Sequence, residues 1–172
     1  MNRLFVIPVL LFISAVLAIP NNSFSQASPA ELATLQGLNQ KGIGVRVENV
    51  DADAAADGLD VKKLEKIITQ KIKKAGVKVI TNQEVNTLPG QPRLVLNINT
   101  VKQPGPIYIY TTSLDVYQIV ILARNNSLSA VSPTWSVLTT GGALPEDLHK
   151  SVEASLAPLL DSFIRDYKVA NP

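Results

Sequence analysis

Residues 60–81 read DVKKLEKIITQKIKKAGVKVIT, and this stretch decides the fold more clearly than any other part of the chain. Its apolar side chains recur every three or four residues, which is the spacing of one helix face. Asp60 is suited to cap the helix, because its carboxylate can accept from the free amides of the first turn. Gly76 is suited to end it, because glycine readily adopts the left-handed conformation that follows many helices. The stretch therefore predicts a helix that packs an apolar stripe on a core. The stripe consists of Val61, Leu64, Ile68, Ile72 and Ala75.

Short apolar segments flank this helix on both sides. Residues 42–50 (GIGVRVENV) alternate apolar and polar side chains, which is typical of a half-buried strand. Residues 77–81 (VKVIT) predict a second strand. A crossover through a helix is almost always right-handed and makes its two strands parallel. We therefore expect a β-α-β unit over residues 42–81.

Three further strands are expected after this unit, over residues 93–101, 107–124 and 134–140. Short turns join them, which favours an antiparallel meander. The core face of the middle strand is expected to carry Leu114, Val116, Val120 and Leu122.

A long helix is expected at the end of the chain. Pro145 opens it, and Pro158 inside it predicts a kink. Its apolar stripe consists of Leu148, Val152, Leu156, Leu159, Phe163 and Tyr167. The predicted order is β-α-β-β-β-β-α. We expect an α+β fold, a two-layer sandwich in which a mixed sheet carries two helices on one face.

The first 27 residues have the features of a secretory signal peptide. Arg3 precedes an uncharged apolar run, and Ala27 is a suitable cleavage site, with a second possible site at Ala18. The alternative is an uncleaved N-terminal anchor. We expect residues 28–41 to form a polar lead-in and residues 42–172 to form a single α/β domain. The predicted location is periplasmic or secreted.

The composition excludes several classes of function. The chain has no Cys and one His, so thiolate chemistry and a multi-histidine metal site are excluded. Its 16 Lys and Arg residues nearly balance 14 Asp and Glu residues, which argues against nucleic acid as a partner. We expect no metal, no cofactor and no enzymatic activity.

Two local patterns suggest chemistry but lack necessary parts. Residues 51–62 resemble a calcium loop, but Ala55, Ala56 and Lys62 stand where a ligand, a glycine and a glutamate are needed. His149 has no nucleophile motif to serve. We therefore predict no catalytic residue.

Aromatic side chains on the meander are the first candidates for a binding site. Aromatic residues on an uncovered sheet face often anchor a partner, although packing in the core is the alternative. The candidates are Tyr108, Tyr110, Tyr117 and Trp135. The face without helices is expected to carry Val95, Asn97, Asn99, Asp115, Tyr117, Ile119 and Trp135.

A lysine cluster on the first helix is the second candidate. It could contact an anionic surface or an acidic envelope protein, with membrane contact peripheral at most. The alternative is the solvent face of an amphipathic helix. The patch consists of Lys62, Lys63, Lys66 and Lys73.

The chain resembles a group of small exported bacterial α/β proteins that have no assigned activity. The residues that carry the resemblance are Gly58-Leu59, Ala75-Gly76-Val77, Thr134-Trp135, Phe163-Ile164, Tyr167 and Asn171-Pro172. The element order is also similar to the N-terminal domain of the Tol-system propeller protein. The resemblance implies a small envelope domain and supplies no site residues.

Together these patterns predict an exported, non-enzymatic binding domain associated with the cell envelope. The alternative is a small-molecule or lipid carrier with a pocket between the helices and the sheet.

Overall fold

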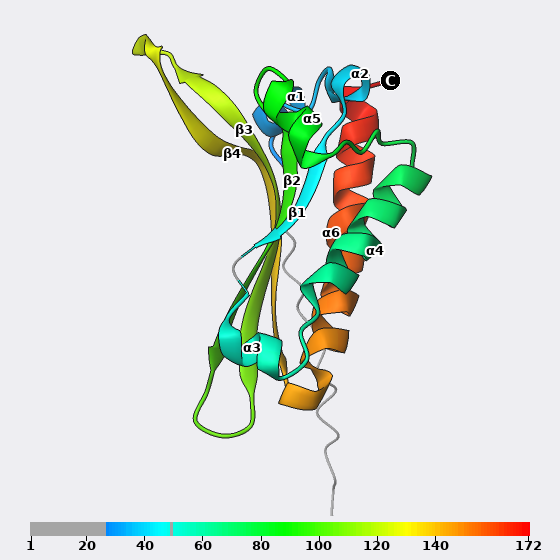
Figure 1. Cartoon of the computed structure of the whole chain (residues 1–172), viewed down its shortest axis with the longest axis vertical. Coiled ribbons are helices and arrows are strands. Elements are labelled where there is room, and N and C mark those ends of the chain that lie inside the picture. The colour runs from blue at the N-terminus through cyan, green and yellow to red at the C-terminus, as the bar shows by residue number, and fades with distance from the viewer. Residues whose placement is uncertain (1–26, 49) are drawn as a thin grey trace, which may run out of the picture.

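A computed structural model describes residues 27–48 and 50–172 of the chain (Figure 1). In these residues one mixed sheet has the strand order β1-β2-β3-β4. The strands are β1 (Gly44–Glu48), β2 (Arg93–Lys102), β3 (Tyr108–Leu122) and β4 (Asn125–Ala143). The β1 and β2 strands are parallel, whereas β2, β3 and β4 form the expected antiparallel meander. The predicted signal peptide lies outside the described residues, apart from Ala27.

Two long helices, α4 (Val61–Lys74) and α6 (Leu148–Ala170), lie on one face of the sheet (Figure 1). This arrangement confirms the predicted two-layer α+β sandwich. Asp60 caps α4 as expected, because its Oδ1 accepts from the Lys63 amide at 3.0 Å. A 3₁₀ turn, η1 (Pro145–Asp147), leads into α6, and α6 continues through Pro158. The shorter helices are α1 (Pro29–Ala33), α2 (Leu38–Lys41), α3 (Ala52–Ala56) and α5 (Asn82–Thr87).

The predicted strand at residues 77–81 is reduced to a single parallel bridge between Ile43 and Val79. Thr81 begins α5 instead, because its hydroxyl accepts from the Glu84 amide while the Glu84 carboxylate accepts from the Thr81 amide. This reciprocal capping box starts a helix where the strand would have continued. The sheet therefore has four strands and not the predicted five.

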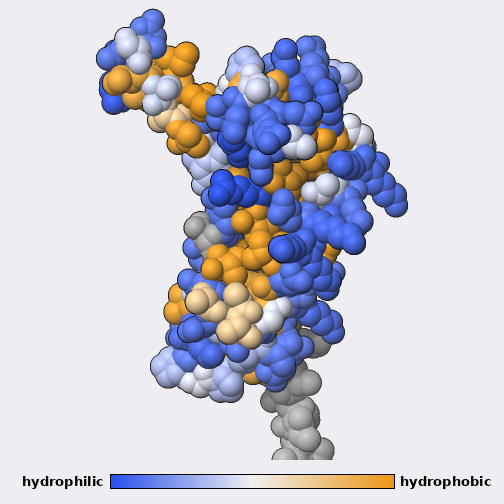
Figure 2. All heavy atoms as spheres, in the orientation of Figure 1, coloured by the Kyte–Doolittle hydropathy of each residue, from blue (hydrophilic) through white to orange (hydrophobic). Residues whose placement is uncertain are grey.

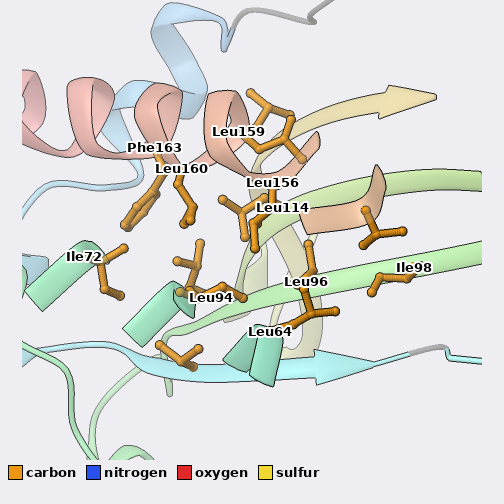
Figure 3. Packing of buried hydrophobic residues seen from close by; sticks show 14 of the residues in the cluster. Leu64, Ile72, Leu94, Leu96, Ile98, Leu114, Leu156, Leu159, Leu160 and Phe163 are labelled. Atoms are coloured by element: carbon orange, nitrogen blue, oxygen red, sulfur yellow. The ribbon is translucent and has the colours of Figure 1, made fainter. Parts of the chain in front are cut away.

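The core lies between the sheet and the two long helices. Alternate residues of β2 and β3, including Leu94, Leu96 and Leu114, point toward α6 and are fully buried (Figure 3). They meet α6 side chains such as Leu156 and Phe163. Leu35 of the polar lead-in also belongs to this core.

The β3 and β4 strands extend beyond the sheet as a two-stranded arm over residues 118–132. The pairing of β2 with β3 ends at Arg93 and Tyr117, so β3 has only β4 as a partner beyond that point. The arm bends away from the helices (Figure 1). Val120 and Leu122, which were expected in the core, lie on this arm and are only partly buried. The β4 strand thus begins at Asn125, nine residues before the predicted start at Thr134.

Exposed aliphatic side chains mark the arm (Figure 2). Ile121 is 67% exposed and Val131 is 69% exposed, while Ile119 and Leu128 are exposed to lesser extents. Clusters of exposed apolar side chains often mark contact sites.

Candidate functional site

The sheet face opposite the long helices carries a shallow cleft at the base of the arm. The cleft has a volume of about 410 Å³. It runs from β1 across β2 to the first residues of the arm. It is lined by Arg46, Glu48, Gln91, Arg93, Val95, Asn97, Tyr117, Gln118, Ile119 and Val131.

Two arginines form the polar side of the cleft. Arg46 on β1 pairs through its Nε with Glu48 Oε1 at 2.9 Å. Arg93 on β2 donates from Nη2 to Asn86 Oδ1 at 2.6 Å and from Nη1 to the Gln91 carbonyl at 3.2 Å. A guanidinium has more N–H donors than these contacts use. Arg93 is therefore held by two hydrogen bonds, Arg46 is 58% exposed in its pair with Glu48, and both still have donors for a ligand.

The turn before β2 shapes one wall of the cleft. Gln91 has a φ of 44° and is the non-glycine residue with positive φ in the described part of the chain. This left-handed conformation costs about 1 kcal/mol or more for a residue with a side chain. The neighbouring Gly90 carbonyl accepts from the Ile119 amide at 2.7 Å, so the turn is joined to the base of the arm. Strain that persists in this way is common at binding sites.

A buried polar network forms the floor beside the cleft. Asp115, which is 5% exposed, accepts from Asn97 Nδ2 at 2.7 Å and from Ser113 Oγ at 2.7 Å. Its other oxygen accepts from the Ser136 hydroxyl. The network joins side chains of β2, β3 and β4 on the face opposite the long helices. It fixes Asn97, which lines the cleft, in one orientation.

Tyr117 lines the cleft, whereas the other three predicted aromatic residues point toward the helices. Trp135 is fully buried, donates from Nε1 to Asp166 Oδ2 at 3.1 Å and contacts the Phe163 ring edge-on at 5.4 Å. Placing Trp135 on the uncovered face was therefore wrong. Successive strand residues alternate between faces, and Trp135 is opposite Val116, a core residue, in the register.

Tyr108 and Tyr110 are also buried in the core, and their hydroxyls reach the edge of the molecule. Tyr108 donates to Asp57 Oδ2 at 2.6 Å, and Lys102 Nζ lies 3.1 Å from the same oxygen. The bond from Tyr108, aided by Lys102, lowers the pKa of Asp57. The bond to Asp57 raises the pKa of Tyr108. These contacts attach the segment after α3 to the sheet, which is a structural role.

The lysine patch lies on the exposed side of α4. Lys62, Lys66 and Lys73 are exposed and make no ion pair within the described residues. Lys63 differs, because its Nζ pairs with Glu153 of α6 at 3.0 Å. The spacing of the three unpaired lysines places them along one line opposite the buried stripe of the helix. The patch remains a candidate contact for an anionic surface.

His149 holds the start of α4 in place. Its Nδ1 accepts from the Asp60 amide at 3.3 Å, and its Nε2 lies 3.5 Å from Glu153 Oε2. In the part of the chain that the structure describes, no three His, Asp or Glu side chains gather where they could hold a metal ion. Across the same residues, no helix combines the length and hydropathy needed to cross a bilayer.

The sequence alone did not single out Arg46, Arg93 or Gln91. Alternation along residues 42–50 placed Arg46 on the polar side of its strand. Arg46 and Arg93 share the cleft because of the strand register. Arg46 is opposite Val95, which follows Arg93 by two residues on β2. That register becomes known only when the strand order is known.

Comparisons with known proteins show a distant likeness in fold. No known protein family matches the sequence, and no curated protein matches it significantly. A PelC dodecamer structure from Paraburkholderia phytofirmans is 13% identical, covers 82% of this chain and 96% of its own, and has a TM-score of 0.45. A single-residue variant of the same dodecamer is 17% identical with the same coverage and a TM-score of 0.47. Likenesses of this size carry no argument about function.

Proposed function

We propose that this chain is an exported, non-catalytic binding domain that holds its ligand in the cleft on the sheet face opposite the long helices. The observation that carries the proposal is the cleft itself, in which Arg46, the hydrogen-bonded Arg93 and Tyr117 lie beside a fixed polar floor. A concave site with a few convergent polar groups beside apolar side chains is the usual form of a ligand pocket. Export follows from the signal-like features of residues 1–27.

The polar groups near the cleft support binding in preference to catalysis. Asp115 has both carboxylate oxygens engaged by hydrogen-bond donors. The sole histidine is on α6, in the helical layer behind the sheet. General acid–base chemistry needs a titratable group within reach of the reacting atom. Glu48, an acid of the lining, is engaged in an ion pair with Arg46. The rest of the lining supplies donors, an aromatic ring and an apolar wall, which are recognition elements.

The filled interior favours the cleft over a carrier pocket between helices and sheet. Leu64 of α4, Leu96 of β2 and Leu156 of α6 are all fully buried within one continuous cluster (Figure 3). Interiors of this kind are close-packed, so a ligand there would have to displace core side chains. The cleft is already open to solvent.

Hydrogen exchange of the full chain, with and without an extract of the cell envelope, tests the proposal. We expect added protection at residues 44–48 and 91–97, which form two walls of the cleft. Tyr117→Ala should remove that protection, because it deletes the aromatic wall. Val169→Ser on α6 is the control, because Val169 is 65% exposed and does not line the cleft.

Two results would overturn the proposal. One is protection that appears only outside the cleft or not at all. The other is protection of the cleft that Tyr117→Ala leaves intact while thermal unfolding shows the variant to be folded. Turnover of a substrate at the cleft would contradict the non-catalytic part alone.

A further inference from the structure

The cleft has a cationic side and an apolar side, and the two sides adjoin. Arg46 and Arg93 lie on β1 and β2, and among the described residues Glu48 lines the cleft with them, while the Asp115 carboxylate lies in the floor beside it. Asp115 has both oxygens engaged by Asn97, Ser113 and Ser136, so the guanidinium groups are the charged groups with donors to offer a ligand. Guanidinium groups are suited to hold carboxylate or phosphate oxygens in paired hydrogen bonds.

The apolar side continues from the cleft onto the arm. Ile119 and Val131 are register partners, so they lie next to each other across the arm, and both line the cleft. Ile121 follows Ile119 by two residues, which places it on the same face of β3. It is 67% exposed, and Val131 is 69% exposed. An apolar strip therefore leads from the cleft along the arm, where Figure 2 shows hydrophobic atoms at the surface.

From this juxtaposition we infer that the cleft binds a single-chain anionic amphiphile. This inference rests on the proposed function of the same site. The head group, a carboxylate or a phosphate, lies between Arg46 and Arg93. The hydrocarbon chain lies along Ile119 and Val131 and extends toward Ile121. Binding would cover aliphatic side chains that are otherwise left in water.

The dimensions of the site favour a small amphiphile over a protein partner. A volume of about 410 Å³ is within the usual range for small-molecule sites. The apolar strip is two strands wide at Ile119 and Val131 and narrows to Ile121 alone, whose partner on β4 is Ser129, which suits one extended chain. A protein interface normally needs a broader surface with a central cluster of buried anchors.

A matched set of probes tests separately the contributions of the charged head group and the hydrocarbon chain to binding. Decanoate carries both halves, decan-1-ol lacks the charge, and acetate lacks the chain. We expect decanoate, kept below its micelle-forming concentration, to bind more tightly than either of the others in calorimetric titrations of the full chain. Decyl phosphate and inorganic phosphate form the second arm. If decyl phosphate binds and inorganic phosphate does not, the head group needs its lipid chain.

Variants then test the assigned positions. Arg46→Gln should weaken decanoate binding about tenfold, because hydrogen bonds to charged groups are lost. Arg165→Gln is its control, because the two arginines are similarly exposed and similarly paired. Arg46 is 58% exposed and pairs with Glu48 at 2.9 Å, and Arg165 is 57% exposed and pairs with Asp166 at 2.9 Å. Val131→Ser should weaken decanoate binding about fivefold. Val169→Ser, at 65% exposure, is the matched control.

The outcomes distinguish this inference from the proposed function. Equal binding of decanoate and decan-1-ol, or equal effects of the variants and their controls, would overturn the inference. If an envelope ligand protects the cleft in hydrogen exchange while no amphiphile binds, the inference fails and the proposed function stands. An acidic peptide that binds the cleft when decanoate does not would assign the site to a protein partner and overturn the inference.

Discussion

Trp135→Phe tests the contact that fastens the last helix to the sheet. The Trp135 indole is fully buried and donates to Asp166 Oδ2, which is itself on a residue only 5% exposed. Phenylalanine keeps the edge-on packing against Phe163 but has no N–H group. The substitution therefore leaves a buried carboxylate oxygen without its donor and a small void where the indole was.

The expected loss of stability follows from these two effects. A hydrogen bond to a charged group contributes about 1.5–3 kcal/mol, and the void adds about 1 kcal/mol. We expect the free energy of unfolding to fall by about 3 kcal/mol. With a urea m-value of about 1.5 kcal/mol/M, the midpoint of unfolding should fall by about 2 M. Urea titration followed by circular dichroism measures this shift.

Asp166→Asn is the control for this prediction. Its amide oxygen can still accept from Trp135 Nε1, and the lost partner, Arg165, is 57% exposed and can turn to water. We expect a loss of about 1 kcal/mol or less. A Trp135→Phe variant within about 0.5 kcal/mol of the parent, at an unchanged m-value, would refute the assigned role of the contact.

Three other changes probe the surrounding framework. Gly141→Ala should destabilise the fold by about 1–3 kcal/mol in thermal unfolding, because its Cβ would lie 2.5 Å from the buried Tyr110 hydroxyl; an unchanged melting temperature would contradict this. Tyr108→Phe should raise the pKa of Asp57 toward its ordinary 3.8 in an NMR titration. The lowered pKa of Asp57 stabilises the folded parent above pH 3.8. As the pH falls through the Asp57 pKa of the folded parent, this stabilisation is lost, so the difference in stability between parent and variant should vanish. Asp60→Ala should cost about 1 kcal/mol through loss of the α4 cap, and Asp60→Asn should restore it.

The local patterns that predicted the fold correctly are those with strong physical signals. The apolar period of residues 61–75, the Asp60 cap and the Gly76 end located α4 to within a residue. The end of the strand expected at residues 77–81 was also present in the sequence, as the Thr81 and Glu84 spacing of a capping box. The prediction of a fifth strand used only the β-branched residues before Thr81 and missed this spacing.

The arm could not be predicted from local pattern. Residues 125–133 (NNSLSAVSP) have little strand propensity and contain a proline. They are extended because the apolar β3 strand runs beyond β2 and offers them a partner. The sheet face on which Trp135 lies could not be predicted from local pattern either. Alternation shows which residues share a face, and only packing decides which face is buried.

The cleft exists because β2 starts where it does. Pro92 has no N–H group to add to a sheet ladder, so β2 begins at Arg93. Beyond Tyr117, β3 has lost this neighbour, and a bulge between Val116 and Tyr117 lets the arm bend. The turn at Gly90 then holds the bent arm through the Ile119 amide. Arg46, Arg93 and the apolar arm thus meet at one point because one short turn interrupts the sheet. Changes in this turn should therefore alter binding while leaving the helix-covered core intact.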